Sequence, residues 1–391
     1  MKRILVVSAC PSRGNSTGVT GKFMSLLDQL DKTRYQISLL DISFYELNHE
    51  ARRYKVYEYF SINKNFLSFI IGKLPGIRAI FAKHIILTRF KQILRNNQYD
   101  GIILFQIPSF ADDLVTIAHD KGSKMLLYPW GSEVLRVKST VLEQLKKAYS
   151  KADFIIGSRN SNTMIAAREL YNVPEKKLVE VYNDLVVLNK IVEIRKRNLS
   201  RDEMSKNIGI PNSSCNIVCG YNGYLGQRHK IIIDAVAKNK DVLNDYQLVF
   251  PITYGAADGY VDELKTYCGE LGLKYCFITN YLNDEQMACL HLITDLFVEI
   301  QPTDNGNAFL IEALFSKNQI VTGKWLSYYQ FEQFGEPYHI IETIDDLPIC
   351  LRQIFTNQVE KIIPSSQLLE ILRPRQMSEK LRVWSDLFDR I

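Results

Sequence analysis

A polar turn in the last third of the sequence carries the residues with the clearest chemical potential. An apolar run at residues 296–300 leads into this turn, and a helical pattern with Glu312 follows it, eight positions beyond Asp304. The start of a helix favours anions, because its free N–H groups and its dipole both attract negative charge. Glu312 lies about two helical turns further on, where a carboxylate can reach the hydroxyls of a bound ribose. The segment therefore offers groups that a nucleotide-sugar site needs.

The spacing Asp304-x7-Glu312 resembles the donor site of family-four, GT-B-fold glycosyltransferases, whose motif runs Glu-Gly-Phe-Gly-x4-Glu-Ala-Met. Asp304 stands in place of the first Glu, and Asn305 and Asn307 stand where the glycines would be, around Gly306. The resemblance implies that Asp304 contacts the sugar and Glu312 the ribose, as catalytic residues, and that the three residues directly after Asp304 bind the donor. An ordinary β-turn-α connection is the alternative, because Asp-Asn-Gly turns are common before helices.

A basic loop follows the strand expected at residues 217–221 and contains Gly226, Arg228 and Lys230. Glycine permits a tight turn, and the two cations can neutralise a diphosphate. In the resembled family this loop holds the donor's diphosphate, so these three residues are candidate donor-binding residues. Lys230 as a surface residue that opens the next helix is the alternative. Tyr254, shortly after the following strand, is a further candidate lining the nucleotide pocket.

Two loops in the first half are candidates for binding an acceptor. The first contains Asn15 and Ser16, whose small size lets a ligand approach the backbone, although a purely structural turn explains it equally well. The second reads Trp130, Gly131, Ser132 and Glu133 and follows an apolar strand, so it should lie at the ligand-binding edge of a parallel sheet.

This second loop is similar to the Trp-Gly-Ser/Ala-Asp segment of several bacterial sugar transferases, including 4-acetamidofucosyl transferases. The resemblance implies that Trp130 stacks on a sugar and that Glu133 bonds an acceptor hydroxyl or removes its proton. The alternative is a helix start, with Ser132 as the cap and Glu133 in the first turn.

Short apolar strands alternate with helical patterns along the whole sequence, which predicts an α/β protein with parallel sheets. With the family resemblance, we expect the GT-B fold: two Rossmann-like domains facing each other across a cleft, with a C-terminal helix crossing back to the first. The expected boundaries are 1–190 for the acceptor-binding domain, 191–372 for the nucleotide-sugar-binding domain and 373–391 for the crossing helix. Strands are expected at 3–8, 36–41, 101–106, 124–128, 154–157, 178–182, 217–221, 247–251, 275–278, 296–300 and 319–322.

Length and composition agree with two globular domains, since 391 residues exceed what one core usually supports. The sequence is 46% hydrophobic and 23% charged, and we expect neither a signal peptide nor a membrane-spanning segment. The seven cysteines are scattered without zinc-site spacing, which suggests reduced thiols and a cytoplasmic protein.

Positive charge is concentrated in the segment 51–97, where ten basic residues accompany a single acid, Glu58. Because aromatic and aliphatic residues lie between these charges, the segment suits an anionic membrane surface, which would make the protein peripheral at the inner face of the membrane. A solvated face over an ordinary core is the alternative. We expect no nucleic-acid partner, because the sequence lacks the motifs of such proteins.

Together these patterns predict a hexosyltransferase that moves a sugar from a nucleoside diphosphate to a glycan or polyprenyl-linked acceptor in bacterial surface polysaccharide synthesis. We expect no cofactor and no metal, because the basic loop can stabilise the leaving diphosphate and no Asp-x-Asp motif is present. The family-four likeness implies retention of configuration, whereas the acetamidofucosyl likeness implies inversion. A sugar-nucleotide epimerase and an inactive partner subunit of another transferase are the remaining alternatives.

Overall fold

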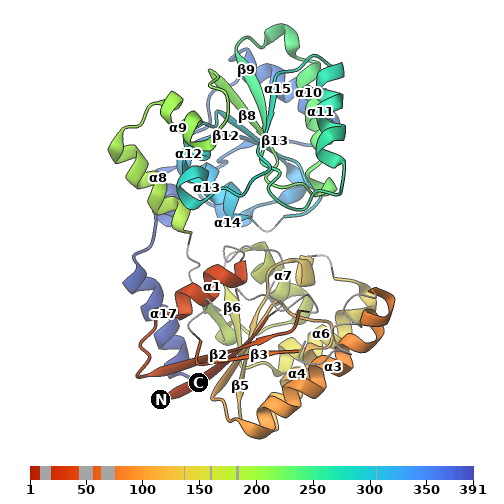
Figure 1. Ribbon diagram of the computed structural model, residues 1–391, viewed down its shortest axis with the longest axis vertical. Helices are drawn as coiled ribbons and strands as arrows, with labels where there is room; N and C mark the ends of the chain where they lie inside the picture. Colours follow the sequence, from red (N-terminus) through yellow and green to blue (C-terminus); the bar gives the residue numbers. More distant parts are fainter. Residues whose placement is uncertain are drawn as a thin grey trace. The chain divides into compact units, whose positions relative to one another are not determined.

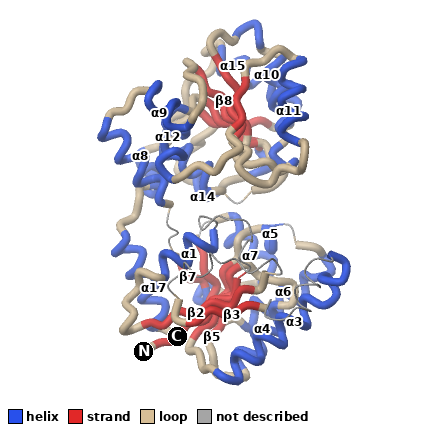
Figure 2. Tube along the Cα trace, in the orientation of Figure 1, coloured by secondary structure: helices blue, strands red, loops and turns tan. Residues whose placement is uncertain are grey.

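The computed structural model describes residues 1–8, 19–43, 56–62, 75–135, 137–158, 161–181, 185–304 and 306–391. Contacts divide the chain into two compact units, which are considered separately. Unit 1 combines Met1–Asp184 with Arg375–Ile391, and unit 2 is Leu185–Pro374. Figure 2 shows the strands of each unit gathered in one sheet, with helices around them.

Unit 1 contains a sheet of seven parallel strands in the order β3-β2-β1-β4-β5-β6-β7 (Figure 1). The strands are β1 (Lys2–Ser8), β2 (Tyr35–Asp41), β3 (Glu58–Ser61), β4 (Gly101–Phe105), β5 (Lys124–Tyr128), β6 (Phe154–Gly157) and β7 (Leu178–Glu180). The helices are α1 (Val19–Leu27), α3 (Pro75–Asn96), α4 (Ala111–His119), α5 (Ser132–Leu135), α6 (Ser139–Lys151), α7 (Asn162–Tyr171) and α17 (Met377–Asp389). The chain order reverses between β1 and β4, and ligands bind parallel sheets at the carboxyl ends of strands beside such a switch point.

Unit 2 contains six parallel strands in the order β10-β9-β8-β11-β12-β13, so its switch point lies between β8 and β11. The strands are β8 (Cys215–Cys219), β9 (Tyr246–Phe250), β10 (Tyr275–Phe277), β11 (Leu296–Glu299), β12 (Gln319–Gly323) and β13 (His339–Ile341). The helices are α8 (Val186–Arg197), α9 (Arg201–Ile208), α10 (His229–Ala237), α11 (Tyr260–Glu270), α12 (Asp284–Ile293), α13 (Ala308–Ser316), α14 (Tyr329–Glu332), α15 (Leu347–Phe355) and α16 (Ser366–Leu372).

Each sheet separates two apolar cores, because its strands carry buried side chains on both faces. In unit 2, Phe297 of β11 belongs to the core beneath α8, α12 and α13, whereas Leu296 and Val298 belong to the opposite core. Glu299 follows this alternation on the same face as Phe297. The alternation therefore directs a carboxyl group from the end of a central strand towards α13.

The C-terminal helix α17 packs against unit 1, beside α1 (Figure 1). Trp384 is fully buried, and its ring centroid lies 5.2 Å from that of Phe23 in α1. Asp389 accepts hydrogen bonds from Arg34 and from the Tyr35 hydroxyl, both at 2.6 Å. The chain thus returns to its first unit, and the two expected Rossmann-like units, each with a parallel sheet, are confirmed.

Two strands were not expected from the sequence. β3 lies within the basic segment 51–97, and β13 follows the last strand that we expected. Both are edge strands of three or four residues. Edge position alone does not explain this, because the edge strands β7 and β10 were expected. In β3 and β13 polar residues, Glu58 and Ser61 in the first and His339 in the second, shorten the apolar run.

Candidate functional site

The loops that follow β8 and β11 lie side by side at the switch point of unit 2. The Gly220 N–H donates to the carbonyl oxygen of Val298 at 3.1 Å, which joins the ends of the two strands. Further along, the Gln227 amide donates to the Gln301 side chain at 3.1 Å. The candidate site is therefore built from two loops that approach each other beyond the sheet.

Asp304 holds the turn in front of α13. Its Oδ2 accepts hydrogen bonds from the backbone N–H of Gly306 at 2.8 Å and of Asn307 at 3.0 Å, and from the Asn307 side-chain amide at 3.0 Å. Asn307 in turn caps α13 by accepting from the Leu310 N–H at 2.9 Å. The turn chemistry predicted from the sequence is present at Asp304, Gly306 and Asn307, while Asn305 lies outside the described residues.

Gly306 fits this turn for two reasons. Its φ of +72° is a conformation that side chains with a Cβ rarely adopt. A Cβ at this position would also lie 2.1 Å from Nε2 of Gln330. The glycine therefore allows the turn to pack against the segment around α14.

Glu312 points away from the Asp304 turn and into the interior of unit 2. Its Oε2 lies 2.9 Å from Nε2 of His291 on α12, and only 4% of its side chain is exposed. The His291 ring is fully buried, 4.3 Å from that of Phe309. The pair joins α12 to α13, and contact between Glu312 and a ribose stays a prediction.

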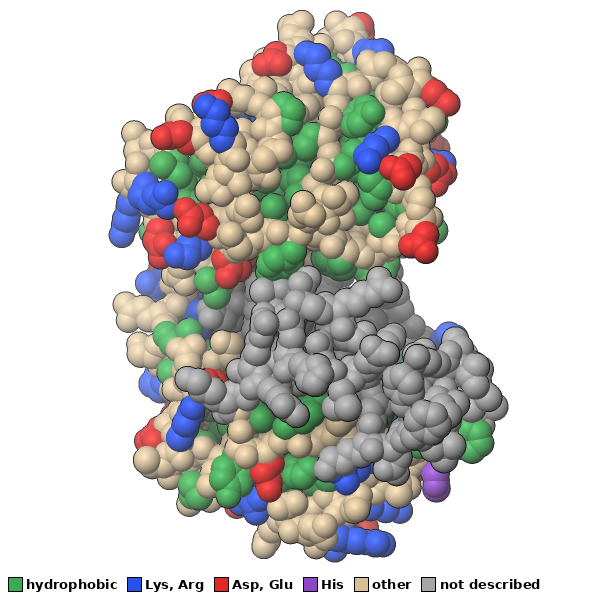
Figure 3. Space-filling view, in the orientation of Figure 1, with side chains coloured by type: hydrophobic (Ala, Val, Ile, Leu, Met, Phe, Trp, Pro, Cys, Tyr) green, Lys and Arg blue, Asp and Glu red, His purple; other side chains and the backbone are tan. Residues whose placement is uncertain are grey.

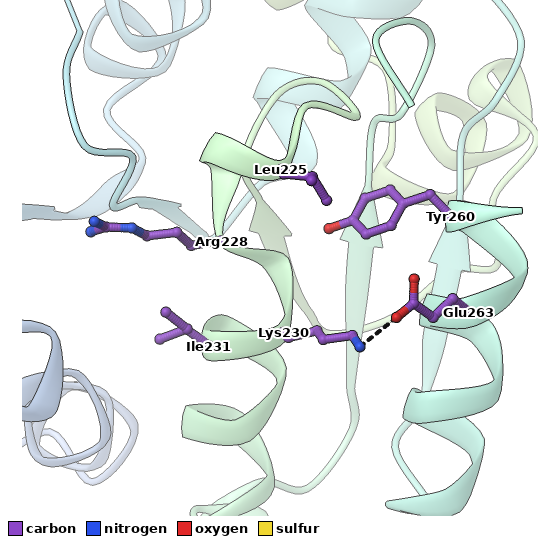
Figure 4. A pocket seen from close by; sticks show the side chains of 6 residues that line it. All are labelled: Leu225, Arg228, Lys230, Ile231, Tyr260 and Glu263. Carbon is purple, nitrogen blue, oxygen red and sulfur yellow. Dashed lines mark hydrogen bonds and ion pairs between the residues drawn. The ribbon is translucent and has the colours of Figure 1, made fainter. Parts of the chain in front are cut away.

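Arg228 and Lys230 diverge, as Figure 4 shows. Nη1 of Arg228 donates to the carbonyl oxygen of Ile300 at 3.0 Å, and its guanidinium lies 5.8 Å from the centroid of the Trp325 ring. Nζ of Lys230 instead pairs with Glu263 of α11 at 2.5 Å. A pocket of about 210 Å³ lies between these side chains and Tyr260, Leu225 and Ile231. The structure brings only Arg228 to the end of β11.

The backbone of Arg228 supports a functional role for its position. Its φ of +58° is unusual for a residue other than glycine, and such conformations cluster at ligand-binding sites. Partial desolvation lowers the pKa of its guanidinium below the usual value, although the group stays charged. Among the described residues its guanidinium donates to Ile300 alone, through one of five N–H donors, so the others can meet an anionic ligand.

Aromatic side chains lie exposed on the neighbouring loops. Tyr254 is 52% exposed and Tyr224 is 58% exposed, with their rings edge to face at 6.1 Å. Gly223, which sequence reasoning missed, allows this approach, since a Cβ there would lie 2.5 Å from the backbone nitrogen of Ala256. At Gly226, by contrast, a Cβ would meet only Pro302, at 3.9 Å. A side chain would therefore be tolerated at Gly226, the predicted donor-binding residue, but not at Gly223.

Glu299, the last residue of β11, was also missed. It is fully buried, and neither carboxyl oxygen has a hydrogen-bond partner among the described residues. Burial raises the pKa of this carboxyl group well above its usual value, and the nearby Asp304 charge raises it further. The signal in the sequence was a single acid within the apolar run at residues 296–300.

In unit 1, Glu133 holds two loops together at the carboxyl edge of the sheet. Its Oε1 accepts from the Trp130 N–H at 2.7 Å and from the Ile107 N–H at 3.4 Å. The Trp130 ring packs 5.1 Å from that of Phe105, and Gly131 has a φ of +122° that suits glycine. Ser132 is the first residue of α5, while Asn15 and Ser16 lie outside the described residues. Trp130, Gly131 and Glu133 therefore come together, with Glu133 engaged by backbone donors.

The described residues contain neither a metal-binding cluster nor a membrane-spanning helix. No cluster of three or more His, Cys, Asp or Glu side chains in this part of the chain has the arrangement to hold a metal ion. No helix among the described residues has the length and apolar character to cross a membrane.

No protein-family model and no curated protein matches the sequence. Solved structures match over its whole length. HepE of Anabaena, in complex with UDP and glucose, is 15% identical with a TM-score of 0.63, and 100% of each chain is covered. A glycosyltransferase from Rickettsia africae is 14% identical with a TM-score of 0.65, covering 100% of this chain and 98% of that one.

A UDP-GlcNAc 2-epimerase from Methanocaldococcus jannaschii also matches, at 11% identity and a TM-score of 0.60, with 99% of each chain covered. The GT-B fold expected from the sequence is thus confirmed. Because the same fold serves transferases and an epimerase, the fold alone does not identify the reaction. The narrower likenesses to family four and to acetamidofucosyl transferases stay predictions.

Proposed function

We propose that the protein is a glycosyltransferase that takes a sugar from a nucleoside-diphosphate donor bound at the end of β8 and β11. The observation that carries this proposal is the bond of Arg228 to Ile300 at the end of β11, at the switch point of the unit 2 sheet, on the loop that leads to the capped start of α13. A cation on the loop that leads to a helix start suits a diphosphate. The UDP bound by HepE, which shares the fold, supports a nucleotide sugar as the donor.

In this proposal Arg228 and the start of α13 stabilise the charge that develops on the diphosphate as the bond to the sugar breaks. These groups are fixed before the reaction, so the site spends little energy on reorganisation. This positive potential is what allows transfer without a metal ion. Asp304 faces the sugar, and Tyr254 with Tyr224 offers aromatic surface to the nucleoside.

Unit 1 presents the acceptor, a glycan or polyprenyl-linked sugar of a bacterial surface polysaccharide, near Trp130 and Glu133. We favour retention of configuration. Glu133 accepts from two backbone N–H groups, so the fold already engages the oxygen that a general base would need. Inversion, with Glu133 as the base, is the second candidate, and it is supported by the position of Glu133 at the carboxyl edge of the sheet.

The test compares Arg228 with Lys230, a matched cation two positions away. Arg228→Gln is expected to weaken binding of the preferred nucleoside diphosphate by about 10- to 100-fold, the size of a lost charged hydrogen bond. Lys230→Gln should change the dissociation constant by less than about threefold, because Lys230 is exposed and paired with Glu263. Calorimetric titration of UDP, GDP and dTDP measures both. Equal affinity of wild type and Arg228→Gln would refute the donor site.

Assays of nucleotide-sugar turnover distinguish a transferase from an epimerase and from an inactive partner subunit. A transferase without its acceptor should release nucleoside diphosphate slowly from one sugar donor, whereas an epimerase should convert the donor without releasing nucleotide. The two histidines nearest the site, His229 and His291, are fully buried, which disfavours an epimerase that uses histidine as a base. The partner-subunit alternative draws support from the engagement of Asp304 and Glu312 inside the protein, and it predicts no turnover of any donor.

We also propose that the basic segment brings the protein to the inner face of an anionic membrane. On α3, Lys91 and Arg95 are exposed, while Phe90 and Ile93 pack in the core and Lys83 pairs with Asp113 at 2.7 Å. Acids and bases are interspersed over the described residues on the face drawn in Figure 3, so any attraction should be modest. Sedimentation with phosphatidylserine vesicles should fall as salt rises, and no sedimentation at low salt would overturn the proposal.

A further inference from the structure

Trp325 reaches the proposed donor site from a third strand of unit 2. It follows β12 in a short 3-10 helix, Lys324–Leu326, and its side chain is half-buried. The indole N–H donates to the carbonyl oxygen of Gln301 at 2.8 Å, one residue beyond the carbonyl that accepts the Arg228 hydrogen bond. The Arg228 guanidinium lies over the indole, 5.8 Å from the ring centroid. One side chain thus contacts both the cation proposed to bind the diphosphate and the backbone that holds this cation.

A glycine leaves room for this ring. Gly323, the last residue of β12, has a φ of −92°, which any residue adopts, so its backbone does not require glycine. A Cβ at Gly323 would lie 2.2 Å from Cζ2 of Trp325. The missing side chain is therefore explained by the passage of the indole over this position, and a larger residue would displace the ring from Arg228.

Two buried glutamines fix the backbone beside Arg228 without touching its charged group. Gln227 directly precedes Arg228, and its amide donates to the Gln301 side chain at 3.1 Å. Its oxygen accepts from the Tyr221 N–H at 3.2 Å, and the Gln301 amide donates to the Tyr221 hydroxyl at 3.4 Å. These bonds join the loops, but an arginine side chain on a fixed backbone still has many rotamers. Trp325, by contrast, acts on the guanidinium itself.

The nature of the contact suits a cation that must still bind an anion. An aromatic face attracts a guanidinium, yet it accepts none of the strong hydrogen bonds that a carboxylate would accept. A carboxylate in the place of Trp325 would occupy the N–H donors of Arg228 and offset its charge. Trp325 restricts the side chain and leaves both available. An arginine that is ordered before its ligand arrives avoids an ordering cost equivalent to roughly 3- to 10-fold in affinity.

We propose that Trp325 is a positioning residue of the donor site, which holds the Arg228 guanidinium at the end of β11 in the place where the diphosphate binds. It acts through Arg228 and not by its own contact with the nucleotide. This inference rests on the proposed function, since it concerns how the same cation is held.

A double-mutant cycle tests whether Trp325 acts through Arg228. Trp325→Leu should weaken binding of the nucleoside diphosphate by about 3- to 10-fold. The double variant Arg228→Gln with Trp325→Leu should bind within about twofold of Arg228→Gln alone, because no guanidinium is left to position. Losses that multiply in the double variant would show that Trp325 affects binding independently of Arg228, and they would overturn the inference.

Three more variants separate positioning from folding. Trp325→Phe keeps an aromatic face and should bind more tightly than Trp325→Leu. Gly323→Ala keeps both Trp325 and Arg228 but displaces the ring, so it should weaken binding as Trp325→Leu does. Phe315→Leu is the matched control, because the Arg195 guanidinium lies 5.5 Å from the Phe315 ring in the last turn of α13. This control should leave the affinity unchanged.

The readouts are the melting temperature, which shows that each variant is folded, and the dissociation constant for whichever of UDP, GDP and dTDP the wild type binds most tightly. Wild-type affinity in Trp325→Leu, or equal losses in Trp325→Leu and Phe315→Leu, would overturn the inference while Arg228→Gln still binds weakly. A wild type that binds none of the three nucleotides, or an Arg228→Gln variant of unchanged affinity, would instead refute the proposed function.

Discussion

Replacing Glu299 by Gln should stabilise unit 2 increasingly as the pH rises. In the folded protein burial and the Asp304 charge raise the pKa of this carboxyl group well above its usual value of 4.5. In the unfolded chain the group titrates normally. A raised folded pKa means that the stability contribution is fully present below the unfolded pKa and is lost as the pH rises towards the folded pKa. Gln cannot ionise, so the variant escapes that loss.

The size of the effect follows from linkage. Within the window between the two pKa values, each pH unit costs the wild type about 1.4 kcal/mol relative to the variant. From pH 5.5 to 7.5 the gap in the free energy of unfolding should widen by up to about 2.7 kcal/mol. For a unit of 190 residues, Leu185–Pro374, this upper limit corresponds to a widening of at most about 5–10 °C in melting temperature.

Scanning calorimetry of wild type and Glu299→Gln at pH 5.5, 6.5 and 7.5 measures the gap directly. Glu263→Gln is the matched control, because Glu263 is exposed and paired with Lys230 on the surface. Its melting temperature should follow that of the wild type at each pH. If the gap between wild type and Glu299→Gln is the same at all three values, Glu299 is ionised in the folded protein and the reasoning fails.

Three further predictions concern the loops and the C-terminal helix. Gly306→Ala should lower stability by about 1–2 kcal/mol in chemical denaturation, because of its positive φ and the contact with Gln330; adding Gln330→Ala should restore part of this loss, and no loss in the single variant would contradict the account. His291→Leu should cost about 1–3 kcal/mol by leaving Glu312 buried without its bond, and an unchanged denaturation midpoint would show that the pair is dispensable. Trp384→Ala should cost about 3–5 kcal/mol and lower the melting of unit 1 alone, whereas a matching shift in unit 2 would be inconsistent with α17 belonging to unit 1.

The strands were predictable from the sequence because central strands of a parallel sheet are buried on both faces and read as apolar runs. Residues 101–105 and 296–299 are such runs, and both are fully buried strands. β3 and β13 were not expected, although β7 and β10, which also lie at sheet edges, were. Polar residues at the ends of β3 and β13 leave too few apolar residues together to indicate a strand.

In the candidate site too, some features were predictable from the sequence and others were not. The Asp304 turn was predictable because its hydrogen bonds run to residues two and three positions away, which turn chemistry fixes locally. The side chain of Lys230 turns towards Glu263, 33 positions away. The side chain of Glu312 turns towards His291, 21 positions away. Such pairings arise only when the chain folds. Sequence spacing placed these residues on the right elements without showing which way their side chains point.

Hydrogen exchange with and without nucleoside diphosphate tests the central claim most directly, because it reports where the ligand binds without assuming a reaction. With saturating UDP, GDP or dTDP, whichever binds, the account predicts slower exchange in peptides that cover residues 220–229 and 300–311 of unit 2. Protection that is confined to unit 1, or that leaves both of these loops unchanged while nucleotide is bound, would contradict it.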